Sequence, residues 1–228
     1  MEYFFTKAFN NLTDEEKESF FRSVFMSDSS EYAERLRNQY YASEFKSMGN
    51  NVKIGANVKI VNPQYISIGN DVVIGDNVTL IARGEGGITI KDKAVINDRA
   101  SLDTVMGHSG YIIIGKNVYI GTGTTLFGHI GLEIGDDSLL AQNITVTPYS
   151  HKFDDPSAAI NTQGGHVAKV TIGKDCYLGM GVCVMYSGSI GDGSVIGAHS
   201  TVVKPIPEFS VAVGTPAKVI KRRGNTNE

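Results

Sequence analysis

Histidine is the residue type in this chain that is best suited to exchange a proton near neutral pH, and the sequence holds five. An imidazole can act as a general base without a shifted pKa, provided that it is partly solvated and faces a substrate. His151 has the most favourable position for this role, because a long insertion, residues 152–171, follows it directly. The same position suits an ordinary surface histidine, so the surrounding elements decide between the two interpretations.

A six-residue repeat surrounds these histidines. Its 21 units each begin on an aliphatic side chain and fall into groups of three, within which the spacing is six. The units begin at Met48, Ile54, Ile60, Ile68, Ile74, Leu80, Ile90, Ile96, Leu102, Ile114, Ile120, Leu126, Ile134, Leu140, Val146, Ile172, Leu178, Val184, Ile190, Ile196 and Val202. Successive groups are separated by insertions of 2, 4, 6, 2, 20 and 0 residues, so extra residues occur only after every third unit. This period indicates a solenoid with three strands per coil and its loops at one corner.

The glycines support this phase independently. Residue two of the unit is Gly in eleven of the fourteen first and second units, and in none of the seven third units. Two corners of every coil are therefore expected to be tight, through either a positive φ or a close backbone approach. His108 and His129 fall near the third, looser corner in the two coils before His151, so the three histidines form a loose column.

The repeat predicts an all-β prism of about seven stacked coils over residues 48–207, from which the loop 152–171 projects. Stacking is required because a single hexapeptide cannot bury enough apolar area to offset its ordering cost of about 1–2 kcal/mol per residue. The exposed ends of such a stack need caps. Residues 208–228 are expected to form a tail that packs on the last coils.

The N-terminal residues, 1–47, are expected to cap the other end with short helices. Thr13 and Glu16 have the spacing of a capping box, in which each side chain satisfies a backbone N–H at the start of a helix. Residues 31–46 have the amphipathic spacing of a second helix. Together they predict a helical cap of two segments.

Composition and charge restrict the partners. A net charge of −3 over 228 residues gives no general attraction for nucleic acid or for an anionic membrane. No apolar stretch is long enough to span a bilayer, and the N-terminus lacks the pattern of a secretory signal. Cys176 and Cys183 are the only cysteines, and they imply neither a disulfide framework nor a metal site. A cytoplasmic protein is expected.

Two segments add a family resemblance to the repeat. These are TVTPYSHKFDDP at 145–156 and VIGAHSTVVKPIPEFSVAVGTPAKVIK at 195–221. With the repeat, they resemble the hexapeptide-repeat acyltransferases, and most closely the sugar and polysaccharide O-acetyltransferase branch. The resemblance implies a left-handed parallel β-helix, although general sheet chirality favours right-handed connections. It also implies a homotrimer with active sites between neighbouring prisms, acetyl-CoA as donor and a carbohydrate hydroxyl as acceptor.

The resemblance implies that His151 is the catalytic base. Many relatives hold the imidazole with a Glu in the following loop, but this chain has no acid at the comparable place. Gln163, Asp154, Asp155 or a backbone carbonyl remain open as the partner, and the two aspartates also suit a loop turn. His129 is expected to form a wall of the acceptor site, and Gln163 is also expected among the substrate-binding residues. Tyr177 stands where relatives commonly carry Trp, which is a further expected acceptor contact.

The donor site implied by the resemblance lies along the last coils. Gly179, Met180 and Ala198 are expected beside the pantetheine arm of acetyl-CoA. The lysines expected near its phosphates are Lys204, Lys218 and Lys221, where cations would pair with anionic oxygens. His199 replaces a glycine that is common in the family, and it either touches the donor or fills a corner.

One alternative is disfavoured and two remain open. A zinc site on the histidine column would match a related family of this fold, the γ-class carbonic anhydrases, but the paired histidine spacing of that family is absent, so no metal is expected. An N-acetyltransferase of an amino-sugar nucleotide is the nearest alternative enzyme. A non-catalytic trimeric scaffold is the alternative from another class. Neither the acceptor sugar nor its hydroxyl follows from the sequence.

Overall fold

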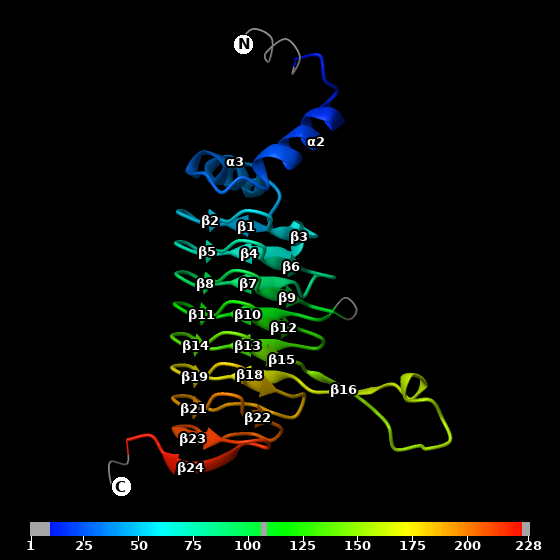
Figure 1. Ribbon diagram of the computed structural model, residues 1–228, viewed down its shortest axis with the longest axis vertical. Coiled ribbons are helices and arrows are strands. Elements are labelled where there is room, and N and C mark those ends of the chain that lie inside the picture. The colour runs from blue at the N-terminus through cyan, green and yellow to red at the C-terminus, as the bar shows by residue number, and fades with distance from the viewer. Residues whose placement is uncertain (1–9, 106–108, 225–228) are drawn as a thin grey trace.

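Three parallel β-sheets form the faces of a long prism in the computed structural model, which describes residues 10–105 and 109–224 (Figure 1). The chain is the all-β, left-handed parallel β-helix that the resemblance implied. Sheet A comprises β1 (Ser47–Met48), β4 (Ile66–Ile68), β7 (Ile88–Ile90), β10 (Ile112–Ile114), β13 (Leu132–Ile134) and β18 (Val170–Ile172). Sheet B comprises β2 (Lys53–Ile54), β5 (Val73–Ile74), β8 (Val95–Ile96), β11 (Tyr119–Ile120), β14 (Leu139–Leu140), β19 (Tyr177–Leu178), β21 (Val195–Ile196), β23 (Ser210–Val213) and β24 (Lys218–Arg222). Sheet C comprises β3 (Lys59–Val61), β6 (Thr79–Ile81), β9 (Ser101–Asp103), β12 (Thr125–Phe127), β15 (Thr145–Val146), β20 (Cys183–Val184) and β22 (Thr201–Val202).

The strand register confirms the six-residue phase. Each unit's first residue lies opposite the first residue three units later, as Ile114 does with Ile134 in sheet A. These first residues point into the prism, and Ile96, Ile120 and Leu126 among them have no exposed surface. One continuous aliphatic core therefore runs along the axis, and neighbouring coils satisfy each other's backbone groups.

The tight corners owe their shape to two different positions of the unit. At residue two the glycines allow close approach: a Cβ on Gly49 would lie 2.6 Å from the carbonyl carbon of Gly69 in the next coil. Positive φ occurs instead at residue four of all fourteen first and second units, with values from 51° at Asp175 to 71° at Gly123. Asn and Asp supply many of these residues, because they tolerate the left-handed region better than most side chains.

Two helices, α2 (Asp14–Phe25) and α3 (Glu31–Ala42), lie over the first coil. The capping box of Thr13 and Glu16 is present at the start of α2. The edge of sheet B is closed by α3: the Asn38 side chain donates to Val52 O at 2.7 Å and accepts from the Ile54 N–H at 3.2 Å. Covering the edge in this way prevents an unpaired strand from pairing with another chain.

The coil continues beyond 207, where the sequence pattern placed its end. Ile206 pairs with Ile190 of sheet A, and Ala212 pairs with Ile196 of sheet B. In earlier coils the N–H of residue two donates to the following coil, as Gly191 N does to Ile206 O at 2.9 Å. Pro207 occupies residue two of its unit, and no later coil follows it in sheet A. An N–H at this position would have no carbonyl to bind, so the missing N–H of proline costs no hydrogen bond. Antiparallel β24 then closes sheet B.

The loops leave from the corner between sheets C and A, as the insertion pattern predicted. A 3₁₀ turn, η1 (Pro63–Tyr65), occupies this corner in the first coil. The longest loop forms a hairpin of β16 (Tyr149–His151) and antiparallel β17 (Gly165–Val167), with η2 (Ile160–Thr162) near its tip. Figure 1 shows this hairpin projecting far from the prism on the side away from sheet B.

Candidate active site

His151 ends β16 at the base of the projecting hairpin, and its side chain is exposed. Its strand partner is Gly165, across the antiparallel pair. The backbone N–H of Lys152 donates to Gly164 O at 3.1 Å and continues the pairing beyond His151. The imidazole is thus held on paired backbone, while its ring remains open to an incoming molecule.

Two aromatic stacks fix the hairpin to the prism on opposite faces. Alternation along a strand places Tyr149 and His151 on one face and Ser150 on the other. On the first face the Tyr149 ring stacks on His129 of the preceding coil, with centroids 5.2 Å apart and planes 11° apart. On the second face His166 stacks on Tyr186 of the following coil at 5.7 Å and 14°.

Tyr149 is also the polar neighbour of His151. Its hydroxyl lies 3.3 Å from His151 Nδ1, and the two rings meet edge-to-face with centroids 4.9 Å apart. Sequence reasoning missed this residue while seeking an acid in the loop. The alternation of β16 could have indicated it, because residues two apart on a strand share a face.

The side chain of Gln163, a candidate partner of His151, is bonded to other residues of its own loop. Its side-chain amide donates to Asp155 O at 2.9 Å and to Ala158 O at 3.0 Å, and its carbonyl accepts from the Asp155 N–H at 3.1 Å. Asp155 Oδ1 accepts from the N–H and hydroxyl of Ser157, and these bonds lower the pKa of its carboxyl. Both residues shape the loop turn, which was the structural alternative for the aspartate.

His129 is buried beneath Tyr149 and is only 7% exposed. Tyr149 therefore covers the surface that His129 was expected to present to the acceptor. Burial lowers the pKa of His129, although the nearby Asp103 carboxylate partly opposes this shift. No described residue hydrogen-bonds its Nδ1. Arg83 holds Asp103 through two bonds of 2.9 Å, so this carboxylate is already neutralised. His108, the third histidine of the predicted column, lies outside the described residues.

The expected pantetheine contacts gather at the corner between sheets B and C. Gly179 packs so closely on the next coil that a Cβ would lie 2.6 Å from Ala198 N. The His199 N–H donates to Met180 O at 2.8 Å, and the Met180 side chain is 47% exposed. Tyr177 lies on the outer face of sheet B and is 45% exposed. This corner and this face lie across the prism from His151, so one chain does not bring the two sets together.

The three candidate phosphate lysines are exposed near the C-terminal end of the prism but do not share one element. Lys218 and Lys221 belong to β24 of sheet B, whereas Lys204 follows β22 at the loop corner. Arg223 has a structural role: it pairs with Asp175 at 2.7 Å and ties the tail to an earlier coil. Among the described residues none forms an ion pair with these three lysines, and all three are exposed.

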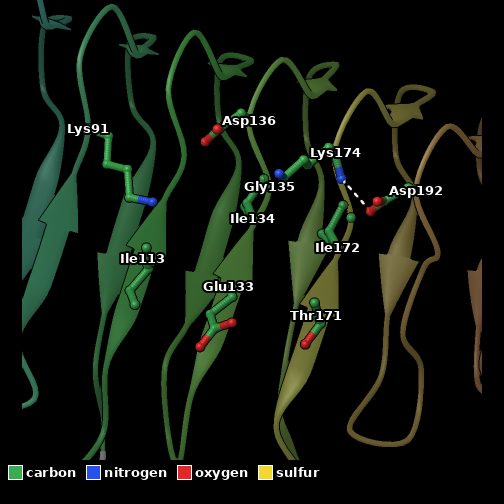
Figure 2. A pocket seen from close by; sticks show the side chains of 11 residues that line it. Lys91, Ile113, Glu133, Ile134, Gly135, Asp136, Thr171, Ile172, Lys174 and Asp192 are labelled. Carbon is green, nitrogen blue, oxygen red and sulfur yellow. Dashed lines mark hydrogen bonds between the residues drawn. The ribbon is translucent and has the colours of Figure 1, made fainter.

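A groove of about 390 Å³ crosses the outer face of sheet A and one corner, and residues of five successive coils line it (Figure 2). Figure 2 shows Lys91 and Lys174 on its rim with Glu133, Asp136 and Asp192. The lysines and carboxylates alternate, and the Lys174 backbone N–H donates to Asp192 at 2.8 Å. None of the site residues predicted from the sequence lines this groove.

Residues 10–105 and 109–224 contain neither a cluster of metal-ligating side chains nor a helix that could span a membrane. In that part of the chain no three His, Cys, Asp or Glu side chains are grouped to share a metal ion. None of the helices there has both the length and the apolar surface needed to cross a bilayer.

Comparisons with known proteins match this architecture. A family model described as the hexapeptide repeat of succinyl-transferase matches residues 65–97, 111–148 and 169–204. A probable acetyltransferase of Mycobacterium tuberculosis is 36% identical over 121 residues, which are 53% of this chain and 40% of that protein. The galactoside O-acetyltransferase of Escherichia coli K12 is 36% identical over 112 residues, 48% of this chain and 53% of that enzyme.

A solved structure resembles most of the chain. A mutant of AntD, an N-acyltransferase from Bacillus cereus, was solved in complex with dTDP and coenzyme A. It superposes with a TM-score of 0.60 at 25% identity, over 83% of this chain and 90% of that one. The chain spans about half the length of the curated relatives above. The repeat that the family model recognises is the register seen in the coils, and this chain is therefore a hexapeptide-repeat protein.

Proposed function

We propose that this protein is an acetyl-CoA-dependent O-acetyltransferase that acts on a carbohydrate hydroxyl, with His151 as its base. The observation that carries the proposal is an exposed imidazole on an anchored hairpin, with Nδ1 beside Tyr149 and no described residue bonded to Nε2. A relative that acetylates galactosides supports a sugar hydroxyl as acceptor. A donor made in metabolism, together with two free cysteines, favours a cytoplasmic location.

The reaction is a direct transfer. Nε2 of His151 takes the proton of the acceptor hydroxyl while the hydroxyl oxygen attacks the thioester carbonyl. Backbone N–H groups at a coil corner stabilise the negative oxygen of the tetrahedral intermediate. When the intermediate collapses, the C–S bond breaks, and His151 returns its proton to the leaving thiolate. The products are an acetyl ester and coenzyme A, and the base is restored.

The donor is proposed to lie along the corner of Gly179, Met180 and Ala198. The exposed side chain of Met180 offers apolar contact to a narrow chain at this corner. Lysines at the end of the prism would pair with the phosphates.

A homotrimer is proposed because these parts lie across the prism from His151 in one chain. The outer face of sheet B supports this arrangement, since it exposes a column of large apolar side chains that a neighbour would cover: Tyr119 is 38% exposed, Leu139 43% and Tyr177 45%. Packing that face near the hairpin of a second copy would complete a site from two chains.

The assembly is tested by light scattering. The trimer has an expected mass of about 74 kDa, three times the chain mass of 24.6 kDa. Leu139→Glu should shift it to the monomer, because a buried unpaired carboxylate opposes assembly. Thr171→Glu, on the outer face of sheet A in the next coil, is the control. A parent protein of one chain mass would refute the trimer, and a trimeric Leu139→Glu would move the interface away from sheet B.

The function is tested by release of free thiol from acetyl-CoA against a panel of sugars and polysaccharides. His151→Ala should slow turnover by about 10²–10⁴, the usual contribution of a positioned base. Its stability should change by no more than about 0.5 kcal/mol, because the side chain is exposed. Turnover at the parent rate would refute His151 as the base. A parent protein with neither thiol release nor an acetyl-CoA-dependent thermal shift would instead be a scaffold.

N-acyl transfer to an amino-sugar nucleotide is the second candidate. The structural similarity to an N-acyltransferase solved with dTDP and coenzyme A favours it. An amine needs less help from a base than a hydroxyl does. Activity that survives His151→Ala and requires an amino-sugar nucleotide would therefore support this candidate over the first.

A further inference from the structure

The hairpin that carries His151 contains an arrangement that the reaction above does not yet use. A base acting through Nε2 must carry its other proton on Nδ1, and a second group must hold that proton in place. The free histidine side chain favours the opposite tautomer, with the proton on Nε2. The only group shown near Nδ1 among the described residues is the Tyr149 hydroxyl, 3.3 Å away.

We propose that Tyr149 is the positioning residue of His151: its hydroxyl oxygen accepts the Nδ1–H and so leaves Nε2 unprotonated and facing the acceptor. This inference rests on the proposed role of His151 as the base. Tyr149 takes the role that a Glu at the comparable place would have, while the candidates Gln163 and Asp155 are bonded to each other and to the loop. A phenol oxygen can accept this bond while its own proton turns to another acceptor.

The Tyr149 ring is held from two sides. On one side it stacks on His129, which is itself buried in the preceding coil. On the other side Gly165 supplies room: a Cβ there would lie 2.2 Å from Tyr149 Cζ. Gly165 is also the strand partner of His151, so the space it leaves is next to the imidazole.

The need for glycine at 165 is steric rather than conformational. Gly165 is absent from the residues with positive φ, unlike its neighbour Gly164 at 73°. Alanine at 165 would therefore suit the backbone and displace only the tyrosine ring. Two substitutions thus test the same contact by different routes: Tyr149→Phe removes the hydroxyl and keeps the stack, whereas Gly165→Ala moves the whole ring.

Both variants are expected to lower kcat by about tenfold, the value of one hydrogen bond to a group that becomes charged during the reaction. The KM for acetyl-CoA should hold, because neither substitution changes a residue of the proposed donor corner. Tyr186→Phe is the matched control: it makes the same change in the other aromatic stack of this hairpin and should keep the parent kcat. Thiol release is measured with the most active acceptor of the panel, or with water alone.

The tautomer supplies a readout that a purely structural role would not move. In protein labelled with ¹⁵N-histidine, His151 should show a protonated Nδ1 and a bare Nε2 at alkaline pH, and Tyr149→Phe should increase the Nε2–H form. A parent protein with mainly Nε2–H, or a Tyr149→Phe variant with the parent kcat and tautomer, would overturn the inference. If His151→Ala keeps full activity, the proposed base has failed, and the tautomer measurement still decides the role of Tyr149.

Discussion

Arg37 is the buried charge on which the N-terminal cap depends, and Arg37→Met should detach that cap. The side chain is 1% exposed although it carries a guanidinium. Its Nε donates to Ile54 O of the first coil at 3.0 Å, and one terminal nitrogen donates to Phe25 O and Asp28 O. One side chain therefore joins α2, α3 and β2. Burial lowers the pKa of Arg37, so its charge is held at a cost.

The magnitude follows from those three bonds. A hydrogen bond to a charged group contributes about 1.5–3 kcal/mol, so the three bonds together contribute at most about 9 kcal/mol to the stability of the cap. Methionine recovers the desolvation cost of the guanidinium and keeps most of the apolar stem, but it leaves three carbonyl oxygens without their donor. We expect a net loss of about 3 kcal/mol in the stability of the cap. Because each coil contacts only its neighbours, the loss should stay local.

Amide hydrogen exchange checks this prediction. Backbone amides of α3 and β2 should exchange about a hundredfold faster, since 1.4 kcal/mol corresponds to a factor of ten. Amides of the central coils should keep the parent rates. Arg35→Met is the matched control, because Arg35 lies on the same helix but is exposed. Equal exchange in the two variants, or acceleration throughout the chain, would refute the reasoning.

Two further predictions concern charged groups. Burial alone would raise the pKa of Asp103, but hydrogen bonds from Arg83 lower this pKa overall. The pair therefore stabilises the fold fully above the unfolded-state pKa of about 3.9. This stabilisation is lost as the pH falls through the lower folded-state pKa. Arg83→Gln should lower the free energy of unfolding by only about 1 kcal/mol at pH 7, because Arg83 is half exposed. In acid the unfolding curves of variant and parent should converge. A difference in stability that does not change with pH would contradict this. Replacing Lys204, Lys218 and Lys221 together by Ala should weaken acetyl-CoA binding about tenfold at low salt and less at high salt, as measured by calorimetry, and unchanged affinity would show that they do not meet the phosphates.

The repeat made most of the fold predictable. Aliphatic residues six apart can be buried together only if every third unit stacks, and the register of Ile114 with Ile134 shows that they do. The capping box was also readable, because its two side chains are three residues apart and interact locally. Strand pairing continues beyond residue 207, where the run of units ended, and the missing neighbour that makes Pro207 harmless is not visible in the sequence.

The candidate site was predictable only in part. His151 could be chosen from its residue type and its place before an insertion, and the resemblance supplied its proposed role. Strand alternation could have placed Tyr149 beside His151, but the stack that holds its ring could not be predicted, because His129 is 20 residues away along the chain and one coil away in space. Gln163 had a suitable side chain for a partner, but loop closure brought it to Asp155 instead.

The amino-acid sequence by itself determined the period, the number of faces and the corner from which the loops leave, because these follow from the spacing of apolar residues, glycines and insertions. Tertiary structure decided which side chains meet across coils: Tyr149 with His129, Arg37 with Ile54, and Gly165 with the ring that fills its space. The physical reason is that stacking buries the side chain of every sixth residue, which gives the sequence a period. A contact such as that of Tyr149 with His129 depends on how a loop folds back on the coils, and it gives the sequence no period.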